Sequence, residues 1–249
     1  MKAVLRLSEP KGDLWHMDRF EQARQAETDY HKRFYRENEV FENGTWISEP
    51  NRIVMELLER VPDSDPQVLD LACGVGRNTL PIASILKESG GRITGVDLLG
   101  DAVNTLKKKA RELGLDDVVV AVESDAEQFD IKKNAYDYIL ACSCLEHLSS
   151  EEAMLQMIDR MQQGTKVGGI HCLSLCTDVV EIDKVTREAM EALIELPLSS
   201  DRAWQLLKER YMGWNVLRRQ VVPQCIDETK YDKSIEFRTN LLTFAVQKV

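Results

Sequence analysis

A short apolar run that ends in a glycine-rich turn, residues 68–80, constrains the fold of this chain more than any other segment. Residues 68–71, Val-Leu-Asp-Leu, are typical of a buried strand, and residues 72–76, Ala-Cys-Gly-Val-Gly, are small or flexible. Glycine allows the backbone to turn sharply and to approach a ligand closely. A helix is expected from Arg77 onward, and the free N–H groups of its first turn favour a polar or anionic ligand. Strand, turn and helix predict the first half of a nucleotide-type site in a doubly wound α/β sheet.

The second half of such a site follows one strand later. Residues 92–97, Arg-Ile-Thr-Gly-Val-Asp, predict the next strand, which ends in Asp97. This acid comes about 20 residues after Gly76, at the spacing where a carboxylate binds the ribose hydroxyls of a nucleoside. The plainer alternatives are that Gly74 and Gly76 only shape a turn and that Asp97 only caps a helix.

Two departures from a dinucleotide site indicate a different ligand. Thr79 occupies the position where a dinucleotide fingerprint needs a third small residue. Asp70, at the strand end, would repel a phosphate but suits a cationic ligand. The acid followed by an Ala-Cys-Gly-Val-Gly turn resembles the first motif of class I S-adenosylmethionine-dependent methyltransferases, whose cofactor carries a sulfonium and no phosphate.

Two further motifs of that family follow in order. Residues 123–126, Glu-Ser-Asp-Ala, come after a β-branched run, and residues 136–148 match the fourth strand and the loop beside the methyl group. The resemblance implies that Asp125 binds the adenine amino group and that the backbone of Ala126 binds the ring, although Asp125 is also an ordinary loop residue type. The full set of cofactor-binding residues that it implies is Asp70, Ala72, Cys73, Gly74, Gly76, Asn78, Asp97, Leu98, Asp125, Ala126, Cys142 and Ser143.

A narrower resemblance concerns the acceptor. Residues 69–80 are similar to the tellurite-resistance methyltransferases, as are Tyr-Met-Gly-Trp at 211–214 and Phe-Arg-Thr at 237–239. That similarity implies small, soft acceptors such as selenium or tellurium oxyanions and thiols. The N-terminal extension and the segment 177–198 depart from the short members of that group, in the regions where the acceptor is chosen.

Strand and helix patterns alternate along the chain, which favours a mostly parallel sheet. Strands are expected near 67–72, 91–96, 118–122, 136–142 and 166–174, with helices near 77–88, 101–113 and 151–163. A helix at 201–211 and two strands, 214–222 and 234–246, complete the expected fold. It is an α/β, doubly wound Rossmann-like sheet of seven strands, mostly parallel, with an antiparallel last strand and helices on both faces.

Residues 1–50 are expected as a helical extension or lid, and residues 51–249 as the methyltransferase domain. Within that domain, 177–210 is an insertion on the substrate side, and its part 177–198 is acidic and helix-capable.

Methyl transfer from a sulfonium needs alignment and exclusion of water, plus a proton acceptor when the nucleophile is neutral. His147, just past the fourth strand, is the candidate catalytic base; the alternative is that it packs against the following helix. Glu146 more plausibly faces solvent or a backbone donor. Tyr35 and Trp46, in an aromatic segment with Trp15, Phe34 and Phe41, are candidates to cover the substrate. They could equally serve only to dock the first helix.

Composition narrows the partners. The net charge is −10 and no basic stripe compensates it, so nucleic acid is not expected as substrate. The four histidines are scattered in sequence, and no metal site is expected. Six cysteines without a C-x-x-C pair, no signal peptide and no membrane-length apolar run favour a cytoplasmic location and no membrane partner. The oligomeric state stays open.

The predicted function is transfer of a methyl group from S-adenosylmethionine to a small-molecule acceptor. One alternative is an NAD-type oxidoreductase, against which Asp70, Thr79 and the terminal strand pair argue. The other is a non-catalytic protein that binds S-adenosylmethionine, because methyl transfer has no obligatory side chain.

Overall fold

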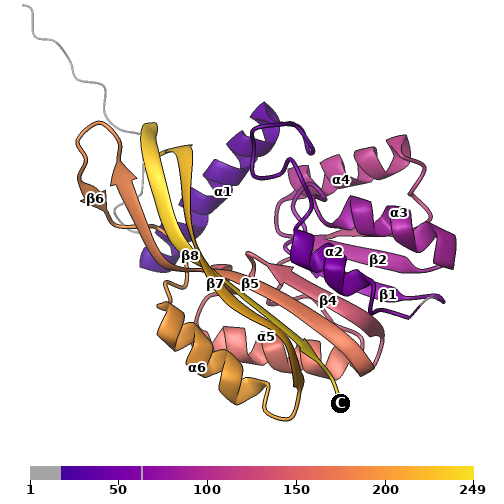
Figure 1. Cartoon of the computed structure of the whole chain (residues 1–249). Coiled ribbons are helices and arrows are strands. Elements are labelled where there is room, and N and C mark those ends of the chain that lie inside the picture. Colours follow the sequence, from indigo (N-terminus) through magenta and orange to yellow (C-terminus); the bar gives the residue numbers. More distant parts are fainter. Residues whose placement is uncertain (1–17, 63) are drawn as a thin grey trace, which may run out of the picture.

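A mostly parallel sheet lies at the centre of the computed structural model, which describes residues 18–62 and 64–249 (Figure 1). Its strands run in the order β3-β2-β1-β4-β5-β8-β7, and β8 is antiparallel to both of its neighbours. The strands are β1 (Gln67–Leu71), β2 (Arg92–Asp97), β3 (Val119–Glu123), β4 (Tyr136–Cys142), β5 (Thr165–Asp183), β7 (Asn215–Lys230) and β8 (Lys233–Gln247). A two-residue strand, β6 (Ala189–Met190), pairs with β5 off this path. The expected seven-strand, doubly wound sheet with its antiparallel strand is confirmed, and β6 is an addition to it.

Helices cover both faces of the sheet, as its alternating strand residues require. On β1, Val68 packs into one apolar cluster and Leu69 into the other, since successive side chains of a strand point to opposite faces. The first cluster also takes in α2 (Arg52–Leu58), α3 (Thr79–Ser89) and α4 (Gly100–Glu112). The second takes in α5 (Glu151–Gly164) and α6 (Ser200–Arg210). Helices on both faces are therefore confirmed.

Two strands, β5 and β7, run further than their sequence pattern indicates. The pattern ends the expected strand 214–222 before Pro223, but β7 continues through this proline to Lys230. Proline is tolerated there because β7 is the edge strand of the sheet. A two-residue turn at Tyr231 and Asp232, both with positive φ, joins β7 to β8. Such turns usually contain asparagine or glycine, so this sequence gives no turn signal.

The expectation of a helix-capable segment at 177–198 is wrong. β5 continues through this segment to Asp183, where it pairs with β8, and β6 follows. Residues 191–199 contain no helix. Pairing with β8 overrides the local helix propensity of this acidic stretch. The backbone of this segment thereby finds hydrogen-bond partners on β8 as far as Asp183.

The first helix, α1 (Arg19–Glu37), lies beside the distal ends of these long strands (Figure 1). Asp18 begins it with a capping box that includes Glu21. The Tyr30 hydroxyl donates to Glu228 of β7 at 2.9 Å, and the Lys230 ammonium reaches Glu27 at 2.6 Å. These contacts anchor α1 to the β7–β8 hairpin and so close one side of the molecule. The N-terminal residues 1–17, including Trp15, lie outside the described part of the chain.

Two further features concern membrane-spanning helices and disulfide bonds. Among the described residues, no helix combines the length and apolar character needed to cross a bilayer. All six cysteines are free thiols, and five of them are buried or half-buried. They therefore act as small packing residues rather than as cross-links.

Candidate functional site

A cavity of about 1010 Å³ opens at the carboxyl ends of the parallel strands and extends to α1 and the distal hairpin. Ligands of open α/β sheets bind at this edge. We divide it into two parts. The cofactor half is lined by Ala72, Gly74, Asp97, Asp125 and Cys142, and the acceptor half by Glu27, His31, His147, Glu195 and Glu228.

The turn after β1 places backbone at the floor of the cofactor half. Ala72 and Gly74 both have positive φ, 57° and 54°. A Cβ atom added at Gly74 would lie 2.6 Å from the Tyr35 hydroxyl, so α1 approaches this turn closely. Cys73 lies in the same turn, and its backbone N–H donates to the Val96 carbonyl of β2. The turn is thus locked to the neighbouring strand and exposes its backbone to the cavity.

Asp97 holds this turn from the end of β2. One carboxylate oxygen accepts the Gly74 N–H at 2.7 Å and the other accepts the Leu99 N–H at 2.9 Å. Burial raises the pKa of Asp97, while these two hydrogen bonds oppose the shift. Each carboxylate oxygen has a second lone pair. Asp97 can therefore hold the turn and still accept from two ribose hydroxyls. Leu98 follows it on the cavity wall.

Three of the expected cofactor residues act from behind the cavity surface or at its margin. Asp70 is buried and accepts from the Thr79 hydroxyl at 2.6 Å, which gives Thr79 a role that the dinucleotide motif does not predict. Burial raises the pKa of Asp70 to about 7, against the Thr79 hydrogen bond. Gly76 faces the core, where an added Cβ would meet Leu106 at 2.6 Å. Asn78 lines the cavity, and its side-chain oxygen accepts the Asn51 N–H at 2.9 Å.

Asp125 and Ala126 line the cofactor half just after β3, where the Ser124 N–H donates to the Asp97 carbonyl at 2.9 Å. Asp125 accepts the Glu127 N–H at 2.8 Å with one oxygen. Its other oxygen lies 3.2 Å from the Arg24 guanidinium. Arg24 comes from α1 and was not a sequence candidate, because no local motif marks an ion pair across 101 residues.

Cys142 and Ser143 border the cavity where β4 ends. Ser143 has a positive φ of 50°, and its N–H donates to the Ser174 carbonyl at 2.9 Å. A hydrogen bond with Cys172, together with burial, raises the pKa of the Cys142 thiol well above its usual value. This thiol therefore stays neutral and does not compete as a nucleophile.

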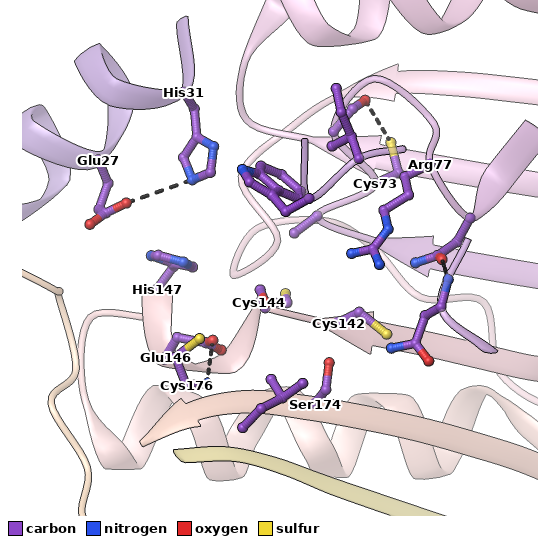
Figure 2. Close-up of a pocket in the computed structure, with 18 of the residues that line it drawn as sticks. Glu27, His31, Cys73, Arg77, Cys142, Cys144, Glu146, His147, Ser174 and Cys176 are labelled. Atoms are coloured by element: carbon purple, nitrogen blue, oxygen red, sulfur yellow. Dashed lines mark hydrogen bonds and ion pairs between the residues drawn. The ribbon is translucent and has the colours of Figure 1, made fainter. Parts of the chain in front are cut away.

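His147 ends the short 3-10 helix η2 (Leu145–His147) and lines the acceptor half (Figure 2). Its Nδ1 lies 2.8 Å from a Glu195 oxygen, and Arg24 contacts the other oxygen of Glu195 at 3.0 Å. Burial would lower the pKa of His147, but the Glu195 hydrogen bond and charge raise it to about 9. An imidazole that is already protonated near neutral pH cannot accept a further proton. The predicted role of His147 as a free base near neutral pH therefore meets an electrostatic obstacle.

The neighbouring Glu146 is fully buried and does not face solvent. One of its oxygens accepts the Cys176 N–H at 2.8 Å, and its backbone carbonyl accepts the Leu196 N–H. Of the two alternatives for Glu146, the backbone donor is the observed one. Glu146 thereby ties η2 to the segment that carries Glu195.

The structure brings together histidines that are scattered in sequence. The rings of His31 and His147 lie 6.4 Å apart in an edge-on arrangement, and His31 Nε2 lies 3.6 Å from Glu27 (Figure 2). Burial lowers the pKa of His31 to about 4, so its imidazole is neutral. Only His147 of this group was a sequence candidate. The spacing of Glu27 and His31, four residues apart on α1, was the available signal.

The aromatic side chains around Tyr35 and Trp46 pack beside His31 at the cavity. Trp46 stacks on Phe34 with ring centroids 5.0 Å apart, and Tyr35 lies 6.3 Å from Trp46. Tyr35 and Trp46 line the cavity, whereas Phe41 is exposed. Tyr35 and Trp46 therefore dock α1 and face the cavity at the same time, so the two alternatives for them are not exclusive.

Comparison with known proteins bears on the central part of the chain. Residues 68–169 match the family model described as a methyltransferase domain. A carboxy-S-adenosyl-L-methionine synthase from Erwinia tasmaniensis is 34% identical over 118 residues, 47% of each chain. Sterol 24-C-methyltransferase ERG6B from Gibberella zeae is 28% identical over 130 residues, which is 52% of this chain and 33% of that protein. The chain thus spans half or less of the length of these curated relatives.

Solved structures share the fold at low identity. TehB from Haemophilus influenzae superposes with a TM-score of 0.61 at 20% identity, over 89% of this chain and 67% of that one. The [4+2]-cyclase SpnF superposes with a TM-score of 0.58 at 19% identity, over 86% and 85%. The fold therefore occurs in proteins named for different reactions. Residues 68–169 therefore match a methyltransferase domain, and the glycine-rich turn and strand order of this chain are similar to those of the class I S-adenosylmethionine-dependent methyltransferases.

Proposed function

We propose that this protein transfers a methyl group from S-adenosylmethionine to a small-molecule acceptor. The observation that carries the proposal is one continuous cavity, which joins the turn after β1 to the space beside α1 and the β7–β8 hairpin. S-adenosylmethionine supplies a methyl group that its sulfonium already activates. The protein then has to bind the two partners in line and exclude water.

In the cofactor half, we assign the ribose hydroxyls to Asp97 and the adenine amino group to Asp125. Asp97 already faces the turn, and Asp125 lines the cavity at the end of the neighbouring strand β3. The backbone of Ala72 and Gly74 offers a close approach to the amino-acid end of the cofactor. Tyr35 shares this space, because its hydroxyl lies over Gly74. We expect this side chain to shift or to hydrogen-bond when the cofactor binds.

In the acceptor half, we assign the chamber between α1 and the β7–β8 hairpin to the acceptor, with His147 as the proposed catalytic residue. The chamber is lined by charged and polar groups, including Glu27, Glu228 and Lys230. This lining favours a small polar acceptor over an extended apolar one. On this assignment residues 18–50 form one wall of the site, and residues 51–249 form the domain that binds the cofactor.

Calorimetry and turnover test the proposal in two steps. Titration with S-adenosylmethionine and, separately, with NADH should give binding of the first alone; binding of NADH alone would favour the oxidoreductase alternative. Transfer of a labelled methyl group to a panel of thiols, amines, hydroxyls and selenium or tellurium oxyanions then identifies the acceptor. Tight binding of S-adenosylmethionine with no transfer to any of these classes would favour the non-catalytic alternative.

A further inference from the structure

We propose that a divalent transition-metal ion such as Zn²⁺ binds in the acceptor half, with Glu27, His31 and His147 as its three ligands. One ligand atom from each of these residues lies within 4.8 Å of the other two. Glu27 and His31 are one turn apart on the same face of α1, and His147 approaches from η2. In Figure 2 the three side chains converge on one point of the cavity.

The distances suit ligands that share an ion better than ligands that bind each other. His31 Nε2 lies 3.6 Å from Glu27 Oε2, which is too long for a good hydrogen bond. Two ligands at about 2.0–2.1 Å from a tetrahedral Zn²⁺ are roughly 3.4 Å apart. The ligand atom of His147 lies within 4.8 Å of the other two, so side-chain rotation toward the ion is part of the proposal.

Two of the three proposed ligands are held by hydrogen bonds to other side chains, as metal ligands in proteins commonly are. A histidine that binds a metal with one ring nitrogen commonly donates the N–H of the other to a carboxylate. Glu195 holds Nδ1 of His147 at 2.8 Å in this way and leaves Nε2 for the ion. Lys230 binds one oxygen of Glu27 at 2.6 Å, and the other oxygen faces His31. His147 Nε2 must release its proton to bind, as metal ligands in general do.

The ligand set also indicates the kind of ion. Two imidazoles and one carboxylate favour Zn²⁺, Fe²⁺ or Co²⁺ over Mg²⁺ or Ca²⁺, which prefer oxygen ligands. Three protein ligands leave at least one position open, as in catalytic rather than structural zinc sites. That open position faces the cavity, because all three ligands line it.

The consequence for the acceptor rests on the methyl-transfer function proposed above. An acceptor X–H bound to the ion would lose its proton to solvent at a lower pH than the free acceptor. X⁻ would then form the X–CH₃ bond as the S–CH₃ bond breaks, and that electron pair would remain on sulfur as a neutral thioether. The ion would thus supply the activation of the acceptor.

Co²⁺ titration of the chelator-treated full chain tests the site without cofactor or acceptor. We expect one equivalent of Co²⁺ to give visible d–d absorption, and Zn²⁺ to displace it and raise the melting temperature. His31→Gln and Glu27→Gln should each weaken binding at least tenfold, and Glu195→Gln by about 10–100-fold. Glu37→Gln, the same change at an exposed position of α1, is the matched control and should bind as the wild type does.

Two results would overturn the metal site. One is Co²⁺ or Zn²⁺ binding by the wild type that is no tighter than by folded His31→Gln. The other is stoichiometric binding that survives all three ligand-side variants, since the ion would then lie elsewhere. Calorimetry with S-adenosylmethionine on the same samples reports the cofactor half separately. Failure of the metal site and failure of the proposed function are therefore distinguishable.

Discussion

The two halves of the cavity are built by different means. The cofactor half consists of backbone turns and short side chains that follow consecutive strands between residues 68 and 143. The acceptor half consists of long charged side chains that meet from distant segments. Lys230 and Glu27, for example, are 203 residues apart, and Tyr30 and Glu228 are 198 residues apart.

This difference explains which half a single sequence can reveal. A strand, a glycine turn and an acid at fixed spacing carry their geometry locally, so the pattern predicts the structure. An ion pair between α1 and a hairpin near the chain end has no local signature. It exists only once the sheet has formed.

The largest expected effect concerns the acceptor half. Lys230 is almost fully buried and contacts Glu27 and the equally buried Glu181. Lys230→Met would leave two buried carboxylates without their cation, which costs about 3–5 kcal/mol of unfolding free energy. Urea unfolding measures this loss, and hydrogen exchange should show α1 opening first.

The matched control is Lys233→Met in the same hairpin. Lys233 is half-exposed and pairs with Asp183 at 3.1 Å, so its loss should cost no more than about 1 kcal/mol. Equal destabilisation by the two variants would contradict the view that a buried ion pair anchors α1 to the hairpin.

The next effect concerns the strand beneath the cofactor half and appears in the pH dependence of stability. Asp70 has an ordinary pKa of 3.8, which burial raises to about 7 in the folded protein. The folded state therefore holds a proton that the unfolded chain has lost, and stability falls as pH rises between these values. Relative to Asp70→Asn, the wild type should lose about 4 kcal/mol across this range and nothing further above it. Unfolding curves of the two proteins that stay parallel from pH 4 to pH 8 would remove this role of Asp70.

Much of the fold was predictable for the same local reason. The order of strands and helices and the parallel core follow from alternating apolar patterns. The length of β7 was not predictable. Pro223 usually indicates the end of a strand, and the residue types of Tyr231 and Asp232 do not predict a tight turn. In the site, Asp97 and Gly74 lie where the motif places them. Glu195 was missed because it binds His147 from a segment without regular structure.

Gly74→Val probes the backbone character of the cofactor half. Gly74 has a φ of 54°, and a branched side chain there is strained and projects toward Tyr35. We expect the affinity for S-adenosylmethionine to fall about 100-fold or more, or about 3 kcal/mol, in a folded protein. Gly90→Val imposes comparable strain, φ 73°, with nothing near its Cβ, and is the control for folding. Normal binding by folded Gly74→Val would show that the turn has only a structural role.

Asp97→Asn has a smaller expected effect on the same half. The amide oxygen can keep one backbone hydrogen bond, but the charge that would bind the ribose hydroxyls is lost. We expect a loss of about 2–3 kcal/mol in binding S-adenosylmethionine by calorimetry. Asp101→Asn, on the neighbouring helix α4, should bind normally. Unchanged affinity in Asp97→Asn would assign the ribose to other groups.

A crystal structure with bound S-adenosylhomocysteine tests the central claim most directly. The account predicts the ribose hydroxyls on Asp97, the adenine beside Asp125, and the thioether sulfur facing the chamber that contains His31 and His147. Both halves of the cavity would then serve one reaction, with the acceptor between sulfur and α1. A nucleoside bound elsewhere, or a sulfur directed away from that chamber, would contradict it.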